Sequence, residues 1–201
     1  RERQARKTRD ALIFGLAALA ESRDPETGRH LERISLYSSR LANELFRQGK
    51  YSLIINREFL RTIGSSSTLH DIGKVSVRDD VLRKPGSLTA EERRHIQTHT
   101  TVGGECIRSV EAQTGDSQFL RMARVIALCH HERWDGTGYP RRLAGQNIPL
   151  AARIVAVADV YDALSMRRTY KPSLPHEQCV AMITAGAGTQ FDPVLVEAFL
   201  A

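Results

Sequence analysis

Histidines and carboxylates at short spacing are the residues of this chain best suited to chemistry. Glu26 and His30 are four residues apart, a spacing that places both side chains on one face of a helix, where they can reach the same metal ion. His70 and Asp71 are adjacent, so an imidazole nitrogen and a carboxylate are available to bridge two cations. Such nitrogen and oxygen donors suit iron, manganese, zinc or nickel better than copper(I). These spacings predict a metal centre.

Further candidate ligands follow along the chain. His99 stands apart from other histidines of this set, and His130 and His131 form a doublet. Asp159 interrupts the otherwise apolar residues 154–160, where a buried carboxylate is costly without a cation or several hydrogen-bond donors. One histidine alone is more often a core or surface residue, but the whole set favours bound metal.

The elements that must position these side chains are predicted to be helices. Apolar residues of segment 30–47 recur at spacings of three, four and seven, the pattern of an amphipathic helix. Thr89 and Glu92 form a capping box that predicts the start of another helix. The remaining expected helices cover residues 1–22, 55–69, 117–130 and 150–165, or begin at Pro175 and Pro193, the latter behind Asp192 as N-cap.

Two kinds of segment differ from this pattern. Residues 153–160 contain β-branched side chains typical of a strand, but the apolar run continues to Leu164 and its length favours a helix. Glycine and proline in segments 73–88 and 134–149 predict loops. The expected fold is therefore all-α and forms a single domain, with an extension helix at the N-terminal end.

Composition excludes several classes of protein. The chain has 201 residues, 41% of them hydrophobic, with a formal net charge of +6, which is unlike a disordered or low-complexity chain. Residues 11–20 form its longest apolar stretch, too short to span a membrane. Its cysteines contain no CxxC pair, which argues against a disulfide framework and favours the cytoplasm. Because basic residues are scattered among few aromatics, we expect no nucleic-acid polymer as partner.

Three motifs resemble those of the HD-GYP domain, the bacterial cyclic di-GMP phosphodiesterase branch of the HD superfamily. They are His-Asp-Ile-Gly-Lys at 70–74, His-His-Glu-Arg-Trp-Asp-Gly-Thr-Gly-Tyr-Pro at 130–140 and Ala-Asp-Val-Tyr-Asp-Ala-Leu at 158–164. The likeness covers nearly the whole chain. It implies a linker or signalling helix over residues 1–22 and a helical catalytic domain over residues 23–201.

The resemblance also implies which residues bind metal. The residues implied to hold one ion are His30, His70, Asp71 and Asp159, and those implied to hold a second ion are Asp71, His99, His130 and His131. Glu26 stands where some relatives bind a third ion. We therefore expect two or three divalent ions, with iron or manganese ahead of nickel or zinc. Thr100 replaces the proline of the family's His-Pro-x-x-Gly pattern, and His95 is expected at the surface.

Other positions are implied to handle substrate. Asp71 and Lys74 match catalytic positions, Lys74 being expected beside the scissile phosphate or the leaving oxygen. Arg168 and Lys171 match phosphate-binding residues, although Thr169 stands where proline is usual. Tyr139 is expected to pack under its loop or beside a guanine.

The activity implied is hydrolysis of cyclic di-GMP to pGpG, and with a suitable site to GMP, by a metal-bridging hydroxide that attacks the phosphodiester. No residue of the motifs distinguishes one base from another, so a related dinucleotide such as cyclic GMP-AMP is an alternative substrate. A further alternative is a module that binds cyclic di-GMP without hydrolysing it. A nucleotide phosphohydrolase outside this branch would not explain residues 135–140. An upstream sensor or receiver domain, a homodimer and a GGDEF-type partner are also left open.

Overall fold

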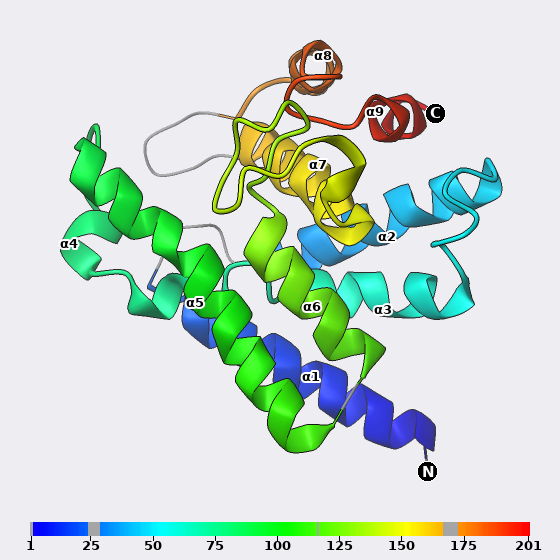
Figure 1. Cartoon of the computed structure of the whole chain (residues 1–201), viewed down its shortest axis with the longest axis horizontal. Coiled ribbons are helices and arrows are strands. Elements are labelled where there is room, and N and C mark those ends of the chain that lie inside the picture. The colour runs from blue at the N-terminus through cyan, green and yellow to red at the C-terminus, as the bar shows by residue number, and fades with distance from the viewer. Residues whose placement is uncertain (1, 24–28, 116, 167–172) are drawn as a thin grey trace.

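The computed structural model describes residues 2–23, 29–115, 117–166 and 173–201. Within these ranges the chain forms helices and no strand (Figure 1), which confirms the predicted all-α fold. None of these helices combines the length and the apolar character that crossing a bilayer requires. The elements are, in order, α1 (Glu2–Glu21), α2 (His30–Arg47), α3 (Arg57–Ser67), η1 (Ile72–Ser76), α4 (Asp79–Leu82), α5 (Ala90–Thr114), α6 (Gln118–Cys129), η2 (Gly145–Asn147), α7 (Leu150–Ser165), α8 (His176–Ala185) and α9 (Pro193–Phe199).

Side-chain caps determine where several of these helices begin. The Thr89 hydroxyl accepts the backbone N–H of Glu92, whose carboxylate accepts the N–H of Thr89, so the predicted capping box is confirmed. The side chain of Ser117 accepts the backbone N–H of Leu120 at the start of α6, and that of Asp192 accepts the N–H of Val194 at the start of α9. Each cap satisfies a backbone donor that a helix start leaves without an intrahelical partner.

Helix α7 is the centre of the molecule. It packs against α2, α6, α8 and α9, and Figure 1 shows it among them. Residues Ile154, Val155 and Val157 are buried on different sides of it, as expected for a helix that is apolar around most of its circumference. The predicted helix over residues 150–165 is confirmed, and the alternative strand reading of residues 153–160 is excluded.

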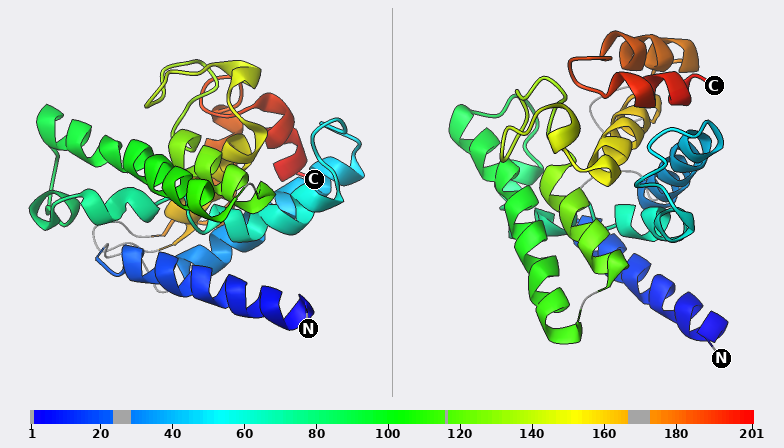
Figure 2. Two further views of the ribbon diagram at one scale, coloured as in Figure 1. Left: turned by 60° about the horizontal axis from the view of Figure 1, so that its bottom comes forward. Right: turned by 45° about the vertical axis from the view of Figure 1, so that its right-hand side comes forward.

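Helix α1 covers a second cluster of apolar side chains. Its Ala17 and Ala20 are buried, and it packs against η1, α2 and α3. The opposite face exposes Leu12, Leu16 and Leu19, each more than half accessible to solvent. Figure 2 shows the N-terminal end of α1 extending away from the other helices, while Ile13, Phe14 and Ala17 pack in the second apolar cluster.

The prediction of a continuous loop over residues 73–88 is wrong, because η1 and α4 lie in this segment. Val77 and Val81 are buried there, and that packing outweighs the local loop-forming tendency. Gly73 permits η1 to approach α5 closely: a Cβ atom at this position would lie 1.9 Å from the backbone oxygen of His99. The other predicted loop, residues 134–149, contains only the short η2.

Candidate metal centre

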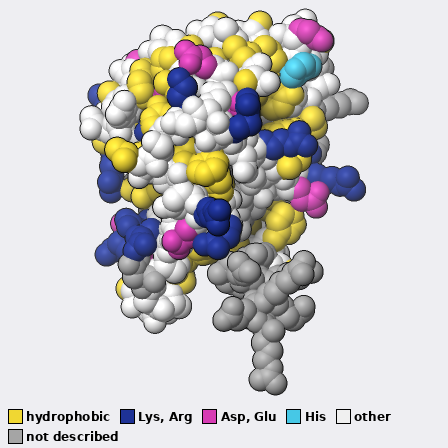
Figure 3. Space-filling view, turned by 90° about the vertical axis from the view of Figure 1, so that its right-hand side faces the viewer, with side chains coloured by type: hydrophobic (Ala, Val, Ile, Leu, Met, Phe, Trp, Pro, Cys, Tyr) yellow, Lys and Arg dark blue, Asp and Glu magenta, His cyan; other side chains and the backbone are white. Residues whose placement is uncertain are grey.

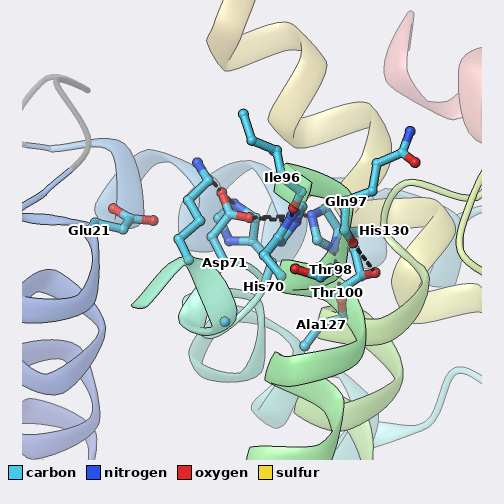
Figure 4. A network of polar contacts seen from close by, with 12 residues as sticks. Glu21, His70, Asp71, Ile96, Gln97, Thr98, Thr100, Ala127 and His130 are labelled. Atoms are coloured by element: carbon cyan, nitrogen blue, oxygen red, sulfur yellow. Dashed lines mark hydrogen bonds and ion pairs between the residues drawn. The ribbon is translucent and has the colours of Figure 1, made fainter. Parts of the chain in front are cut away.

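Predicted ligands from separate stretches of the chain converge beside α5 and α6. His70 and Asp71 follow α3, His99 lies on α5, and His130 and His131 follow α6. One ligand atom from each of four residues, Asp71, His99, His130 and His131, lies within 4.8 Å of all the others. We call these four residues the core group. Figure 4 shows Asp71, His70 and His130 close together in this region.

Backbone carbonyls orient three of the imidazoles. Each ring places Nδ1 against the carbonyl of a residue three or four positions earlier: His70 with Ser67 (3.0 Å), His99 with Ile96 (2.6 Å) and His130 with Ile126 (3.0 Å). A proton on Nδ1 makes this bond and leaves the Nε2 lone pair for a ligand. The Nε2 atoms of His99 and His130 are buried and have no hydrogen-bond partner.

The Asp71 carboxylate faces two sets of imidazoles. Its Oδ1 lies 3.2 Å from Nε2 of His99 and 3.6 Å from Nε2 of His130. Its Oδ2 lies 3.3 Å from Nε2 of His70 and 2.8 Å from Nζ of Lys74. Burial opposes ionisation of Asp71, but the charges of Lys74 and His70 outweigh burial and hold its pKa well below the ordinary value. An ionised carboxylate is thus placed between two possible metal positions.

A second set of ligand atoms lies on the His70 side of Asp71. Glu21, His30 and His70 each offer one atom within 4.8 Å of the others, and we call them the α1 group. The Nε2 atoms of His30 and His70 are 3.5 Å apart, and Glu21 Oε1 is 3.9 Å from Nε2 of His30. Burial raises the pKa of Glu21 to about 7. No local motif pointed to Glu21, because its place depends on how α1 packs.

His30 is oriented by a side chain rather than by its own helix. Its Nδ1 lies 2.7 Å from Oδ2 of Asp162 on α7, and the Arg33 guanidinium donates to Asp162 Oδ1 at 2.5 Å. Burial opposes ionisation of Asp162, but the hydrogen bonds from His30 and Arg33 lower its pKa. The sequence analysis did not identify Asp162, although it stands three residues after Asp159 in the same motif.

The imidazoles differ in their readiness to bind a cation. Burial lowers the pKa of His130, and burial with the charges of His130 and His99 lowers that of His131 well below the usual value. These two rings are therefore neutral near pH 7, which is the form that binds metal. Burial alone would lower the pKa of His70, but Asp71 raises it to about 10.

The remaining predicted site residues are placed differently. Asp159 is half-buried on α7 and belongs to neither group, although its charge contributes to the raised pKa of His70. Lys74 pairs with Asp71 as described above. Glu26, Arg168 and Lys171 lie outside the described residues. His95, expected at the surface, is instead half-buried, and its Nε2 accepts the backbone N–H of Arg78.

The loop after His131 forms one wall of the site. The Tyr139 ring stacks on the His131 ring with centroids 4.8 Å apart and planes 29° apart. The buried Glu132 carboxylate accepts the backbone N–H groups of Arg141 and Leu143, which fixes the far end of the loop. A Cβ atom on Gly138 would lie 2.4 Å from the backbone nitrogen of Arg133, so this close turn needs glycine.

Two cavities lie on different sides of the molecule. A cavity of about 380 Å³ is lined by Arg94, Thr98, Tyr139 and Arg142, between α5 and the loop. A groove of about 930 Å³ runs between α2, α7 and α9, and none of the core-group residues lines it. Figure 3 views the right-hand side of Figure 1, where hydrophobic side chains lie among uncharged atoms and both basic and acidic side chains.

Comparison with known proteins identifies the family of the chain. The HD domain model matches residues 16–195. A cyclic di-GMP phosphodiesterase of Vibrio cholerae serotype O1 is 46% identical over 200 residues, covering 100% of this chain and 41% of the relative. A cyclic di-GMP phosphodiesterase of Thermotoga maritima is 42% identical over 185 residues, covering 92% of this chain and 47% of the relative.

Relatives with another named substrate are also similar. The 3'3'-cGAMP-specific phosphodiesterase 2 of Vibrio cholerae is 40% identical over 195 residues, covering 97% of this chain and 35% of the relative. A crystal structure of a cyclic GMP-AMP specific phosphodiesterase of Vibrio cholerae shares the fold, with a TM-score of 0.59, 21% identity and coverage of 95% of this chain and 47% of that one. The chain spans less than half the length of these relatives. Together with the three motifs, these matches show that the chain belongs to the HD domain family, in its HD-GYP branch.

Proposed function

We propose that the chain is a metal-dependent phosphodiesterase that hydrolyses cyclic di-GMP to pGpG and onward to GMP. One observation carries this proposal: Asp71 Oδ1, His99 Nε2 and His130 Nε2 are buried, close together and without hydrogen-bond partners. Buried polar atoms almost always have a partner, and facing lone pairs of this kind are suited to a cation. The names of the relatives support a cyclic dinucleotide as the substrate.

Two ions fit the ligand atoms on either side of Asp71. We propose that His99, His130 and His131 hold one ion, that His30, His70 and Asp159 hold the other, and that Asp71 touches both; Glu26 is proposed for a third. Oxygen and nitrogen donors favour iron or manganese here, with nickel or zinc as alternatives. When bound, such ions lower the pKa of water toward about 7 and neutralise phosphoryl oxygens.

The residues around the ligands have proposed roles toward the phosphodiester. Hydrolysis adds the oxygen of water to phosphorus, breaks the bond to the 3'-oxygen and leaves a proton on that oxygen. Lys74, held 2.8 Å from Asp71, provides a fixed positive charge for the scissile phosphate, and a charge placed in advance stabilises the transition state. Arg168 and Lys171 are proposed to bind the other phosphate, and the Tyr139 ring to lie beside a base.

Cyclic GMP-AMP is the second candidate substrate, because relatives 40% and 32% identical to this chain are named as 3'3'-cGAMP-specific phosphodiesterases. The two dinucleotides present the same phosphodiester to the metal centre. A discrimination between them therefore depends on contacts to a base. Binding without turnover is the remaining alternative.

One experiment separates these alternatives. Protein purified without oxygen is analysed for metals, then incubated with cyclic di-GMP or cyclic GMP-AMP, and the products are separated by chromatography. We expect pGpG from cyclic di-GMP at a higher rate than any product from cyclic GMP-AMP. Product from cyclic GMP-AMP alone would reassign the substrate. Metal-loaded protein that binds cyclic di-GMP but forms no product would support the binding module.

We also propose a setting for this activity. Because the chain spans less than half of its relatives, we propose that it works beside an upstream sensor or receiver domain, in the cytoplasm. A homodimer and a GGDEF-type protein are further proposed partners. Size measurement in solution and pull-down with a GGDEF-type protein test these two proposals.

A further inference from the structure

The last turn of α1 brings the carboxylate of Glu21 to the candidate metal centre. Glu21 is only 14% exposed, and its Oε1 is buried without a hydrogen-bond partner. Figure 4 shows Glu21 at the end of α1, on the side of the cluster where Asp71 and His70 lie. A buried carboxylate oxygen without a hydrogen-bond donor is unfavourable, and a cation between Glu21 and the histidines would satisfy this oxygen.

The separations in the α1 group fit a shared cation better than hydrogen bonds. Glu21 Oε1 lies 3.9 Å from His30 Nε2, which lies 3.5 Å from His70 Nε2. The longer separation exceeds a hydrogen bond. Two ligands at ~2.1 Å from one ion are about 3 to 4 Å apart, which is the range observed here.

The position of Glu21 is fixed by contacts on both sides of it in the chain. Ala17 and Ala20 are buried against the rest of the molecule. The Arg23 guanidinium donates to the backbone oxygens of Val75 (2.8 Å) and Val77 (2.9 Å). Val75 lies in η1 and Val77 is its C-cap, so the end of α1 is tied to the segment that follows Asp71.

From this geometry we infer that Glu21 is a ligand of the ion proposed for His30 and His70, which makes α1 part of the metal centre. The inference rests on the proposed function in that it requires the ion. It has a consequence for control of the enzyme: a shift of α1 along or around its axis moves a ligand.

Metal binding by Glu21→Gln tests the inference without any substrate. Metal is removed by chelation, and the full chain is titrated with Mn²⁺ in competition with a chromogenic chelator. We expect one class of sites to bind at least about tenfold more weakly than in the unaltered chain. Glu32→Gln is the matched control, because Glu32 is exposed on α2 and loses the same charge; its titration should be unchanged.

Other results of this titration would overturn the inference. The inference would be wrong if Glu21→Gln and the unaltered chain bound Mn²⁺ with equal affinity. It would also be wrong if the ion were lost in Glu26→Gln alone. Thermal unfolding of the metal-free protein separates ligation from a purely structural role. A structural role predicts a lower melting temperature for Glu21→Gln, whereas removal of an unpartnered buried charge predicts no decrease. If the unaltered chain binds Mn²⁺ but cleaves no dinucleotide, the proposed function is wrong. The Mn²⁺ titration of Glu21→Gln still decides whether Glu21 is a ligand.

Discussion

The two halves of the metal centre are built by different means. In the core group, His99 and His130 are oriented by carbonyls of their own helices, at Ile96 and Ile126. In the α1 group, His30 is oriented by the Asp162 side chain, which comes from α7. Glu21 reaches the same group from α1, whose end is held by packing and by the hydrogen bonds of Arg23.

Because of this difference, the positions of the ligand atoms should be harder to change in the core group than in the α1 group. A backbone carbonyl three or four residues earlier is present in any helix, so His99 and His130 keep their orientation while α5 and α6 keep their geometry. The α1 group requires α1, α2, α7 and the segment after α3 to keep their mutual positions. We expect substitutions and conditions to affect the two groups unequally, and the following predictions test that expectation.

Asp71→Ala is predicted to have the largest effect, because Asp71 is the residue that faces both groups. Loss of a shared ligand should remove several kcal/mol of transition-state stabilisation, or about 10³-fold in kcat/KM. Steady-state assays and elemental analysis measure the two consequences. Asp80→Ala removes an exposed carboxylate and should change neither. Asp71→Ala protein with more than about a tenth of normal kcat/KM would disprove a shared role.

Asp162→Ala should weaken only the α1 group. Removal of a carboxylate that orients a ligating histidine costs about 10 to 100-fold in metal affinity, and we expect one ion to be affected while the core group retains its own. Asp162→Asn keeps an acceptor for His30 and should recover part of the loss. A chelator competition that resolves two classes of sites is the measurement. Equal weakening of both classes would contradict the division into two groups.

The sequence predicted some parts of this architecture better than others. The helix over residues 150–165 has a long apolar run whose length excludes a strand, so a local pattern was sufficient there. Asp71, His130 and His131 lie in motifs that resemble those of the family, whereas His99 lies outside these motifs. Their assignment as metal ligands stays a prediction. Glu21 and Asp162 were missed because their partners are determined by the packing of α1, α2 and α7, which no spacing along the chain reveals. The short helices η1 and α4 were missed for the same reason, since buried Val77 and Val81 stabilise them.

The pH dependence of metal binding should also separate the groups. Asp71 raises the pKa of His70 to about 10, so in the metal-free protein this ring is protonated at neutral pH and the ion must displace the proton. Affinity at the α1 group should therefore rise about tenfold per pH unit between about pH 7 and pH 8.5. The lowered pKa values of His130 and His131 predict little change at the core group. Titrations at several pH values check the sign, and a parallel rise at both groups would contradict it.

Tyr139 should have the smallest effect, because it supports the core group through a ring contact and is not one of its ligands. The stack on His131 is of a kind worth about 0.5 to 1.5 kcal/mol, so Tyr139→Leu should lower kcat/KM about 2 to 12-fold while both classes of metal site stay filled. Tyr139→Phe keeps the ring and should be nearly unchanged if stacking is the whole contribution. A large loss of kcat/KM in Tyr139→Phe would instead show that the hydroxyl makes the main contribution. In that case the Tyr139 hydroxyl, and not only the ring proposed to lie beside a base, would act on the substrate.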